Sequence, residues 1–225
     1  MTEQERQDIF QQAERERIQG SARKAVELYE RIVDEPSEIQ AEAQHMLGVV
    51  SCSTEDYERS EKLLRELARQ TTEPNTRGRI LRDLGNTLRK QERYDEASDV
   101  LRESLELFER SGAPAAERAA TIGFQARVLA NEEEFDQALE LARLATDLFS
   151  EGDNRQMELY HAIFLAQLLA QADQPEEARA LAQQLLPSAR KLGKPMHVER
   201  LEIIAAQADD PEAMATAISN QRETP

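Results

Sequence analysis

The sequence has little of what disulfide scaffolds, β-folds and membrane spans require. Among its 225 residues there is one cysteine and no tryptophan, and aromatic residues make up only 4%. The single cysteine, Cys52, excludes an internal disulfide. The shortage of aromatic residues disfavours a β-fold, whose strands are enriched in them. No run of about 18 apolar residues occurs, so we expect no membrane span and no membrane partner.

Positive charge is also scarce. The chain has 44 acidic and 28 basic residues, which gives a formal net charge of −16. Such a field repels nucleic acid and anionic lipid surfaces, so neither is expected as a partner. The segment MTEQERQDIF at the amino end lacks the apolar core of a signal peptide. We therefore expect a cytoplasmic protein, which agrees with its single cysteine.

Helix-forming residues take the place of what is missing. Ala, Leu, Glu, Arg and Gln dominate, while glycine and proline each occur only eight times. In residues 77–109, apolar side chains recur at spacings of three and four in two successive stretches. The short polar connection at residues 91–93 leaves room only for a tight turn between them. This segment therefore predicts two antiparallel amphipathic helices.

Four residues of this segment carry a recognisable motif: Leu84, Gly85, Tyr94 and Ala97. On these residues the segment resembles the tetratricopeptide repeat, which has Leu-Gly in its first helix, an aromatic residue opening the second, and a small residue three positions later. The pattern also has a physical basis. Gly85 and Ala97 are small enough for two backbones to approach closely, and larger residues fill the space beside that crossing.

The same pattern recurs along the chain. The small residues of the successive second helices are Ala25, Ser60, Ala97, Ala138 and Ala178, at spacings of 35, 37, 41 and 40 residues. This lengthening resembles the long-helix repeats of bacterial signalling and regulator domains. The resemblance implies an all-α fold, a right-handed solenoid of about five to six antiparallel helix pairs.

We expect one domain over residues 1–225, because no connection between repeats is long or of low complexity. Helix stops, glycines or prolines separate the expected repeats, which are residues 5–36, 38–73, 76–111, 115–151 and 155–192. A capping helix pair at 195–220 completes the domain, with Asp209 or Asp210 as the cap of its second helix and Pro211 in the first turn.

The resemblance implies a non-enzymatic adaptor or scaffold that binds a protein or peptide in a concave groove lined by the first helices. Two alternatives remain open. The chain could be a homo-oligomeric scaffold that docks an apolar stripe of its last helix pair on a second copy. It could also be a ligand- or peptide-sensing domain of a bacterial regulatory system, closing around its ligand.

Eight residues on the first helices are candidates for the groove. The third repeat presents a basic stripe, the fourth repeat adds one further arginine, and the fifth presents an uncharged stripe; the residues are Arg79, Arg82, Asn86, Arg89, Arg127, Tyr160, Ile163 and Gln167. Arginine binds carboxylates in a bidentate manner, so an acidic segment or a chain terminus is the expected ligand. Arg82 and Asn86 match one helix of the carboxylate clamp of chaperone-binding repeats, but Phe124 replaces the clamp's second asparagine.

A plainer interpretation applies to the same residues. Arginines on helix faces usually pair with nearby acids, as Arg79 could with Asp83, and Arg89 with Glu92 or Asp95. Tyr160 and Ile163 could pack against the last helix pair instead of binding a ligand.

No catalytic, metal or cofactor site is predicted. The three histidines fall in different repeats, and His45 with Cys52 supplies only two of the ligands that zinc needs. Cys52 as a nucleophile would require a base and a lowered pKa, and a buried thiol is the preferred interpretation. There is no glycine-rich phosphate loop.

Overall fold

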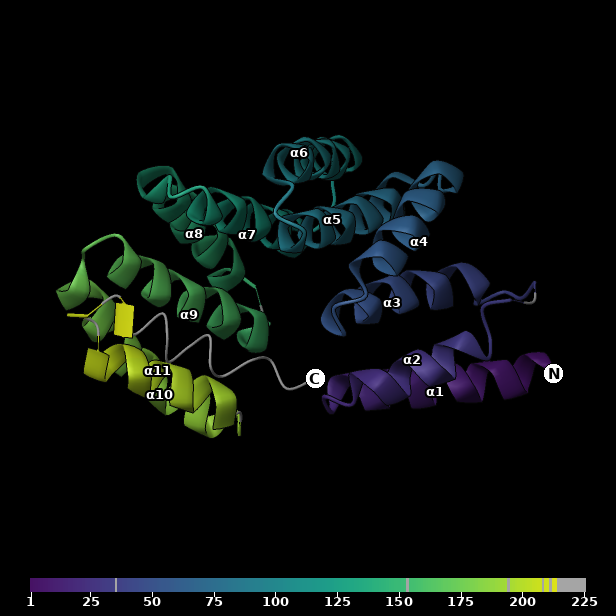
Figure 1. Cartoon of the computed structure of the whole chain (residues 1–225), viewed down its shortest axis with the longest axis horizontal. Coiled ribbons are helices and arrows are strands. Elements are labelled where there is room, and N and C mark those ends of the chain that lie inside the picture. Colours follow the sequence, from purple (N-terminus) through teal and green to yellow (C-terminus); the bar gives the residue numbers. More distant parts are fainter. Residues whose placement is uncertain (35, 153, 194, 208, 211, 214–225) are drawn as a thin grey trace. The chain divides into compact units, whose positions relative to one another are not determined.

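The computed structural model describes residues 1–34, 36–152, 154–193, 195–207, 209–210 and 212–213. These residues contain eleven α-helices and no strand, as the sequence predicts. The helices are α1 (Glu3–Ile18), α2 (Ala22–Glu30), α3 (Gln40–Ser53), α4 (Tyr57–Gln70), α5 (Pro74–Lys90), α6 (Tyr94–Ser111), α7 (Ala115–Asn131), α8 (Phe135–Ser150), α9 (Arg155–Gln171), α10 (Pro175–Lys191) and α11 (Pro195–Gln207). Consecutive helices form antiparallel pairs (Figure 1).

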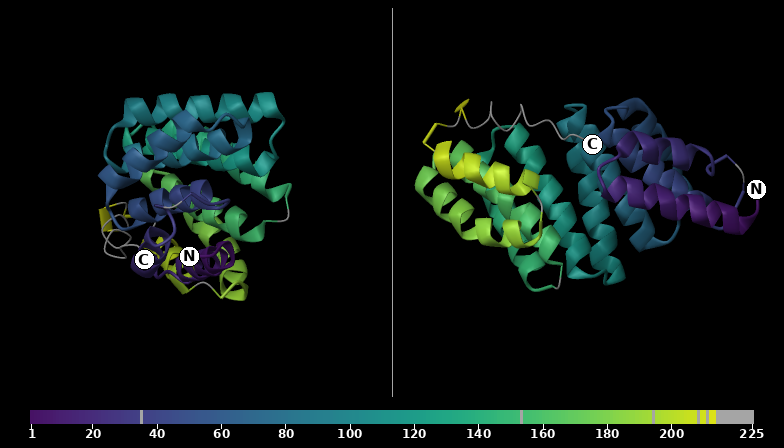
Figure 2. Two further views of the ribbon diagram at one scale, coloured as in Figure 1. Left: turned by 90° about the vertical axis from the view of Figure 1, so that its right-hand side faces the viewer. Right: turned by 90° about the horizontal axis from the view of Figure 1, so that it is seen from below.

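The contacts divide the chain into two compact units, one of residues 1–111 and one that begins at Gly112. The first contains α1–α6 and the second contains α7–α11. A buried apolar core joins α1, α2 and α3 in the first unit, and another joins α7 to α11 in the second unit. Figure 2 shows the helices of each unit from two further directions. The predicted second helix of the capping pair extends to residue 220, and Pro211 and residues 214–220 lie outside the described residues. Of the two predicted caps, the Asp210 carboxylate accepts a hydrogen bond from the backbone N–H of Ala213 at 2.9 Å.

The five small residues that define the repeat register are all fully buried: Ala25, Ser60, Ala97, Ala138 and Ala178. Glycines of the first helices meet leucines of their partner helices at similarly close range. A Cβ atom at Gly85 would lie 2.5 Å from Cγ of Leu101, and one at Gly48 would lie 2.9 Å from Cδ2 of Leu64. The predicted close crossing of the two helices in a pair is therefore confirmed.

The turns within the five pairs share one conformation. In each turn one residue has a positive φ between 57° and 87°; these residues are Gly20, Glu55, Glu92, Glu133 and Asp173. The N–H of the following residue donates to the carbonyl five positions back at 2.8–3.0 Å, as Arg93 does to Leu88. This arrangement is the Schellman motif, which satisfies carbonyls at the end of a helix. It reverses the chain in three residues and so places each second helix against its own first helix.

Candidate functional site

In the first unit, α3 and α5 lie side by side and share a polar cluster. Nε2 of His45 on α3 lies 2.8 Å from Oδ2 of Asp83 on α5, and Nε of Arg82 donates to Oδ1 of Asp83 at 3.3 Å. Burial raises the pKa of the Asp83 carboxyl, but the charge of Arg82 and the hydrogen bond from His45 outweigh it and leave the pKa lowered. Asp83 is therefore a carboxylate at neutral pH.

One turn further along α5, Asn86 and Arg89 continue this cluster. Nη2 of Arg89 donates to Oδ1 of Asn86 at 2.9 Å, and Nδ2 of Asn86 lies 4.0 Å from Sγ of Cys52 on α3. Burial raises the pKa of the Cys52 thiol. The thiol therefore stays protonated, which makes it a poor nucleophile.

The structure thus brings Arg82, Asn86 and Arg89 together on one half-buried stripe of α5, whereas Arg79 is exposed. The pairing proposed for Arg79 is wrong, because Asp83 contacts His45 and Arg82 instead. Sequence reasoning grouped His45 with Cys52 along one helix and missed that His45 pairs with an acid of the next repeat. The available signal was the 38-residue separation of His45 and Asp83, which is close to the repeat spacing.

In the second unit, Arg127 of α7 lies over two aromatic rings of α9. Its guanidinium carbon is 3.9 Å from the ring centroid of Phe164 and 4.9 Å from that of Tyr160. The Nε atom is buried and has no hydrogen-bond partner among the described residues. The residue as a whole is half-buried.

A second contact between α7 and α9 fixes the tyrosine beside Arg127. A Cβ atom at Gly123 would lie 2.1 Å from Cε1 of His161, so only glycine leaves room for this imidazole. The His161 ring stacks on Phe149 at 4.6 Å between centroids and meets the edge of Tyr160 at 5.4 Å. The sequence signal for this contact was the glycine in the middle of an otherwise helical stretch.

The remaining two candidates differ in accessibility. Ile163 is 2% exposed and belongs to the core of the second unit, so it offers no surface to a ligand, and its predicted place in the groove is not carried further. Gln167, one turn beyond Phe164 on α9, is half-buried.

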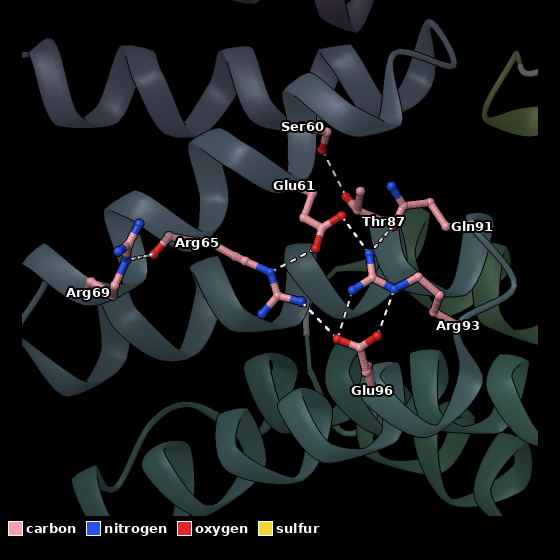
Figure 3. A network of polar contacts seen from close by, with 8 residues as sticks. All are labelled: Ser60, Glu61, Arg65, Arg69, Thr87, Gln91, Arg93 and Glu96. Carbon is pink, nitrogen blue, oxygen red and sulfur yellow. Dashed lines mark hydrogen bonds and ion pairs between the residues drawn. The ribbon is translucent and has the colours of Figure 1, made fainter.

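The second helices carry charges of a different kind, which are neutralised between repeats. Glu61 of α4 accepts hydrogen bonds from Arg65 at 2.8 Å and from Arg93 at 2.7 Å, and both arginines also bond Glu96 of α6 (Figure 3). Burial raises the pKa of Glu61, but the two arginines outweigh this effect and lower it overall. These arginines are committed to carboxylates of the fold and are poorly suited to capture a ligand.

A cavity of about 410 Å³ lies between the start of α9 and the end of α10, with Leu159, Leu185 and Leu192 on its walls and Arg155 and Lys191 at its edge. No group of three or more His, Cys, Asp or Glu side chains that could hold a metal ion occurs in the described ranges. Within those ranges, no helix is long and apolar enough to span a bilayer.

Comparison with known proteins supports the repeat assignment. The family model of the tetratricopeptide repeat matches residues 39–110. No curated protein sequence matches the chain.

Solved structures share the fold over nearly the whole chain. A Rap protein complexed with Competence and Sporulation Factor superimposes with a TM-score of 0.83 at 14% identity, covering 96% of this chain and 63% of that one. The Rap conjugation gene regulator of the plasmid pLS20, in complex with the Phr* peptide, gives a TM-score of 0.79 at 17% identity, covering 94% and 61%. Aspartyl phosphate phosphatase F from Bacillus subtilis gives a TM-score of 0.74 at 12% identity, and the match covers 94% of this chain and 58% of that protein. This chain thus spans about three fifths of the length of these proteins.

Proposed function

We propose that this chain, whose residues 39–110 match the tetratricopeptide repeat, is a non-enzymatic adaptor that binds a segment of a partner protein or peptide on its first helices. Two observations, one in each unit, carry the proposal. In the first unit, half-buried polar side chains form a stripe on α5; these are Arg82, Asn86 and Arg89. In the second unit, half-buried polar and aromatic side chains lie on α7 and α9; these are Arg127, Tyr160 and Gln167. Such side chains supply hydrogen bonds and contact area to an extended segment.

The contrast between the two kinds of helix supports this choice of surface. Arg65 on the second helix α4 is held by Glu96 of the next repeat, and Arg93 in the turn before α6 is held by Glu61 of the preceding repeat. On α7, Arg127 rests on aromatic rings instead. Arg127 is therefore the cation of this surface that the proposal favours most for binding a partner. We propose that the chain acts in the cytoplasm as a single repeat domain over residues 1–225.

The similar structures favour a peptide as the partner. Two of them are complexes, one with Competence and Sporulation Factor and one with the Phr* peptide. Because identity is below 20% and coverage of those proteins is partial, only the fold and not the particular peptide is carried over to this chain. The phosphatase activity of the third structure likewise stays with that protein.

The proposal is tested by affinity capture from extract with the intact chain and two charge-matched variants. Arg82→Gln/Arg127→Gln removes two cations from the first helices, and Arg69→Gln/Arg143→Gln removes two ion-paired cations from α4 and α8. We expect partners that are retained by the intact chain and the second variant and lost by the first. Circular dichroism of both variants shows whether the fold is preserved.

An identical set of partners in all three samples would contradict the proposal, as would no partner at all. In that case the mass of the chain should be measured by light scattering at several concentrations. A mass that rises with concentration would establish a homo-oligomeric scaffold instead.

A second candidate function is peptide sensing within a regulatory system. It is favoured by the likeness to a conjugation gene regulator that holds a peptide. A sensor should change shape when its ligand binds, whereas a stiff adaptor should not. Small-angle scattering with and without a captured peptide separates the two, since only the sensor should lose radius of gyration.

A further inference from the structure

The guanidinium of Arg127 lies over aromatic rings, in a chain with 44 acidic and 28 basic residues. In the same unit, Arg143 lies 2.9 Å from Glu177, and Arg179 pairs with Asp209. No acid lies within ion-pair distance of Arg127 among the described residues. Its guanidinium carbon lies 4.9 Å from the ring centroid of Tyr160 and 3.9 Å from that of Phe164. Arg127 is therefore a half-buried cation whose charge the described fold does not neutralise.

The aromatic rings orient this cation without neutralising it. A guanidinium over a ring face gains cation–π energy and loses freedom to rotate, while its N–H groups at the edge remain able to donate. The rings of Tyr160 and Phe164 are themselves held in place, the first against His161 and the second in the core of the unit. The rings thus fix the direction of the Arg127 donors before a ligand arrives. Less side-chain entropy is therefore lost when the ligand binds.

From this arrangement we infer that Arg127 anchors a carboxylate of an acidic peptide, on the surface that the proposed function assigns to partner binding. The planar fork of arginine matches the two oxygens of a carboxylate, and the pair is strengthened where burial reduces screening by water. Gln167 lies on the same helix one turn after Phe164. Its amide can both donate to and accept from the backbone of an extended peptide.

The charge of the chain selects a carboxylate over other anions. Nucleic acid requires several cations in register, and a net charge of −16 opposes such a polyanion. One unneutralised arginine matches one negative charge. A short peptide with a single Asp or Glu side chain, or a free C-terminus, meets this condition with the least repulsion from the acidic surface.

The inference is tested by selecting binders from a library of random octapeptides on the intact full-length chain, Arg127→Gln, Arg127→Lys and Arg143→Gln. We expect acidic peptides to be enriched by the intact chain and by Arg143→Gln, which removes an arginine of the same unit that is already paired. We expect that enrichment to disappear with Arg127→Gln. Arg127→Lys keeps the charge but not the planar fork, so selected peptides should bind it at least about tenfold more weakly.

Other outcomes separate this inference from the proposed function. Peptides recovered without acidic enrichment, or acidic enrichment that survives in Arg127→Gln, would overturn the role of Arg127 while peptide binding stands. Recovery of no peptide by the intact chain would overturn both. Arg127→Lys keeps a cation over the rings, and circular dichroism shows whether this variant is folded. If the folded variant binds the selected peptides as tightly as the intact chain does, bidentate binding of the carboxylate by Arg127 would also be overturned.

The source of the carboxylate is then found with one selected peptide. It is synthesised with an amidated C-terminus, and separately with each Asp or Glu replaced by Asn or Gln. One of these altered peptides should bind at least about tenfold more weakly than the parent peptide, and the others should bind equally well. The reason is that one guanidinium holds one carboxylate. Equal affinity of all forms would overturn the inference.

Discussion

At the scale of single residues, glycine decides how closely the helices of a pair approach. Gly85 faces Leu101, which is fully buried, at a distance that excludes a side chain. The sequence indicated this, because Leu84 and Gly85 precede Tyr94 and Ala97 at the spacing of the repeat. The role of Gly123 was not foreseen, since its neighbour His161 comes from the next repeat and no local pattern predicts that contact.

Gly85→Ala should destabilise the first unit by about 1–3 kcal/mol, because the added methyl group overpacks a filled crossing. Its Cβ would lie 2.5 Å from Leu101, whose Cγ is close to its own backbone and cannot move far. The measurement is urea unfolding followed by circular dichroism. Gly152→Ala is the matched control, because its Cβ meets its nearest atom at an ordinary 3.6 Å. Equal stability of the two variants would refute the packing seen here.

At the scale of elements, the turn within each helix pair is the repeated device. It requires a left-handed residue, which Gly20 supplies without strain and which Glu55, Glu92, Glu133 and Asp173 supply at a cost. The sequence located the turn at residues 91–93 correctly but did not indicate its conformation, because glutamate is not typical of it.

Glu92→Gly should therefore raise the free energy of unfolding by about 0.5–1 kcal/mol. Relief of the left-handed strain gives about 1–2 kcal/mol, and the greater freedom of glycine in the unfolded chain offsets part of it. Glu106→Gly, at an exposed position inside α6, is the control. This change should lower the free energy of unfolding by about 1 kcal/mol. Urea midpoints compare the two. A loss of stability in both variants would show that residue 92 does not adopt a positive φ in solution.

The ion pairs between second helices predict a dependence of stability on pH. The folded chain lowers the pKa of Glu61, so its carboxylate stabilises the first unit above the unfolded value of about 4.3, and this stabilisation is lost as the pH falls through the lowered folded value. Glu61→Gln should cost about 1 kcal/mol at pH 7, since Arg65 and Arg93 are both partly exposed.

The cost of Glu61→Gln should shrink as the pH is lowered from 5 to 3, because the native residue then becomes neutral as well. Melting temperatures measured across this range test the prediction. Glu66→Gln, which removes an exposed pair with Arg69, should change stability little at any pH. A cost of Glu61→Gln that stays constant with pH would exclude the electrostatic explanation.

At the scale of the whole molecule, we maintain the proposal of one domain over residues 1–225, although the contacts form two compact units. Repeats stabilise one another through their nearest neighbours, so a short array usually unfolds as a single system. We therefore expect one calorimetric transition, with equal calorimetric and van't Hoff enthalpies. Two separate transitions, one of them moved by Gly85→Ala and the other unmoved, would instead establish two domains.

The sequence by itself determined the helices, their pairing and the register of the repeats. Hydrophobic spacing defines which face of each helix is buried, and small residues at regular intervals define where helices cross; both signals lie within about 40 residues. The fully buried positions of Ala25, Ser60, Ala97, Ala138 and Ala178 confirm this register.

Only the tertiary structure decided which polar side chains are already occupied. The sequence treated Arg82 and Arg127 as equivalent, yet Arg82 lies beside Asp83 while Arg127 rests on two rings of the next repeat. It also placed Ile163 on the surface, although this side chain fills the core. Helical periodicity gives the face of a residue but not its neighbour across to another helix, because that neighbour depends on the distance and the crossing angle between the two helices.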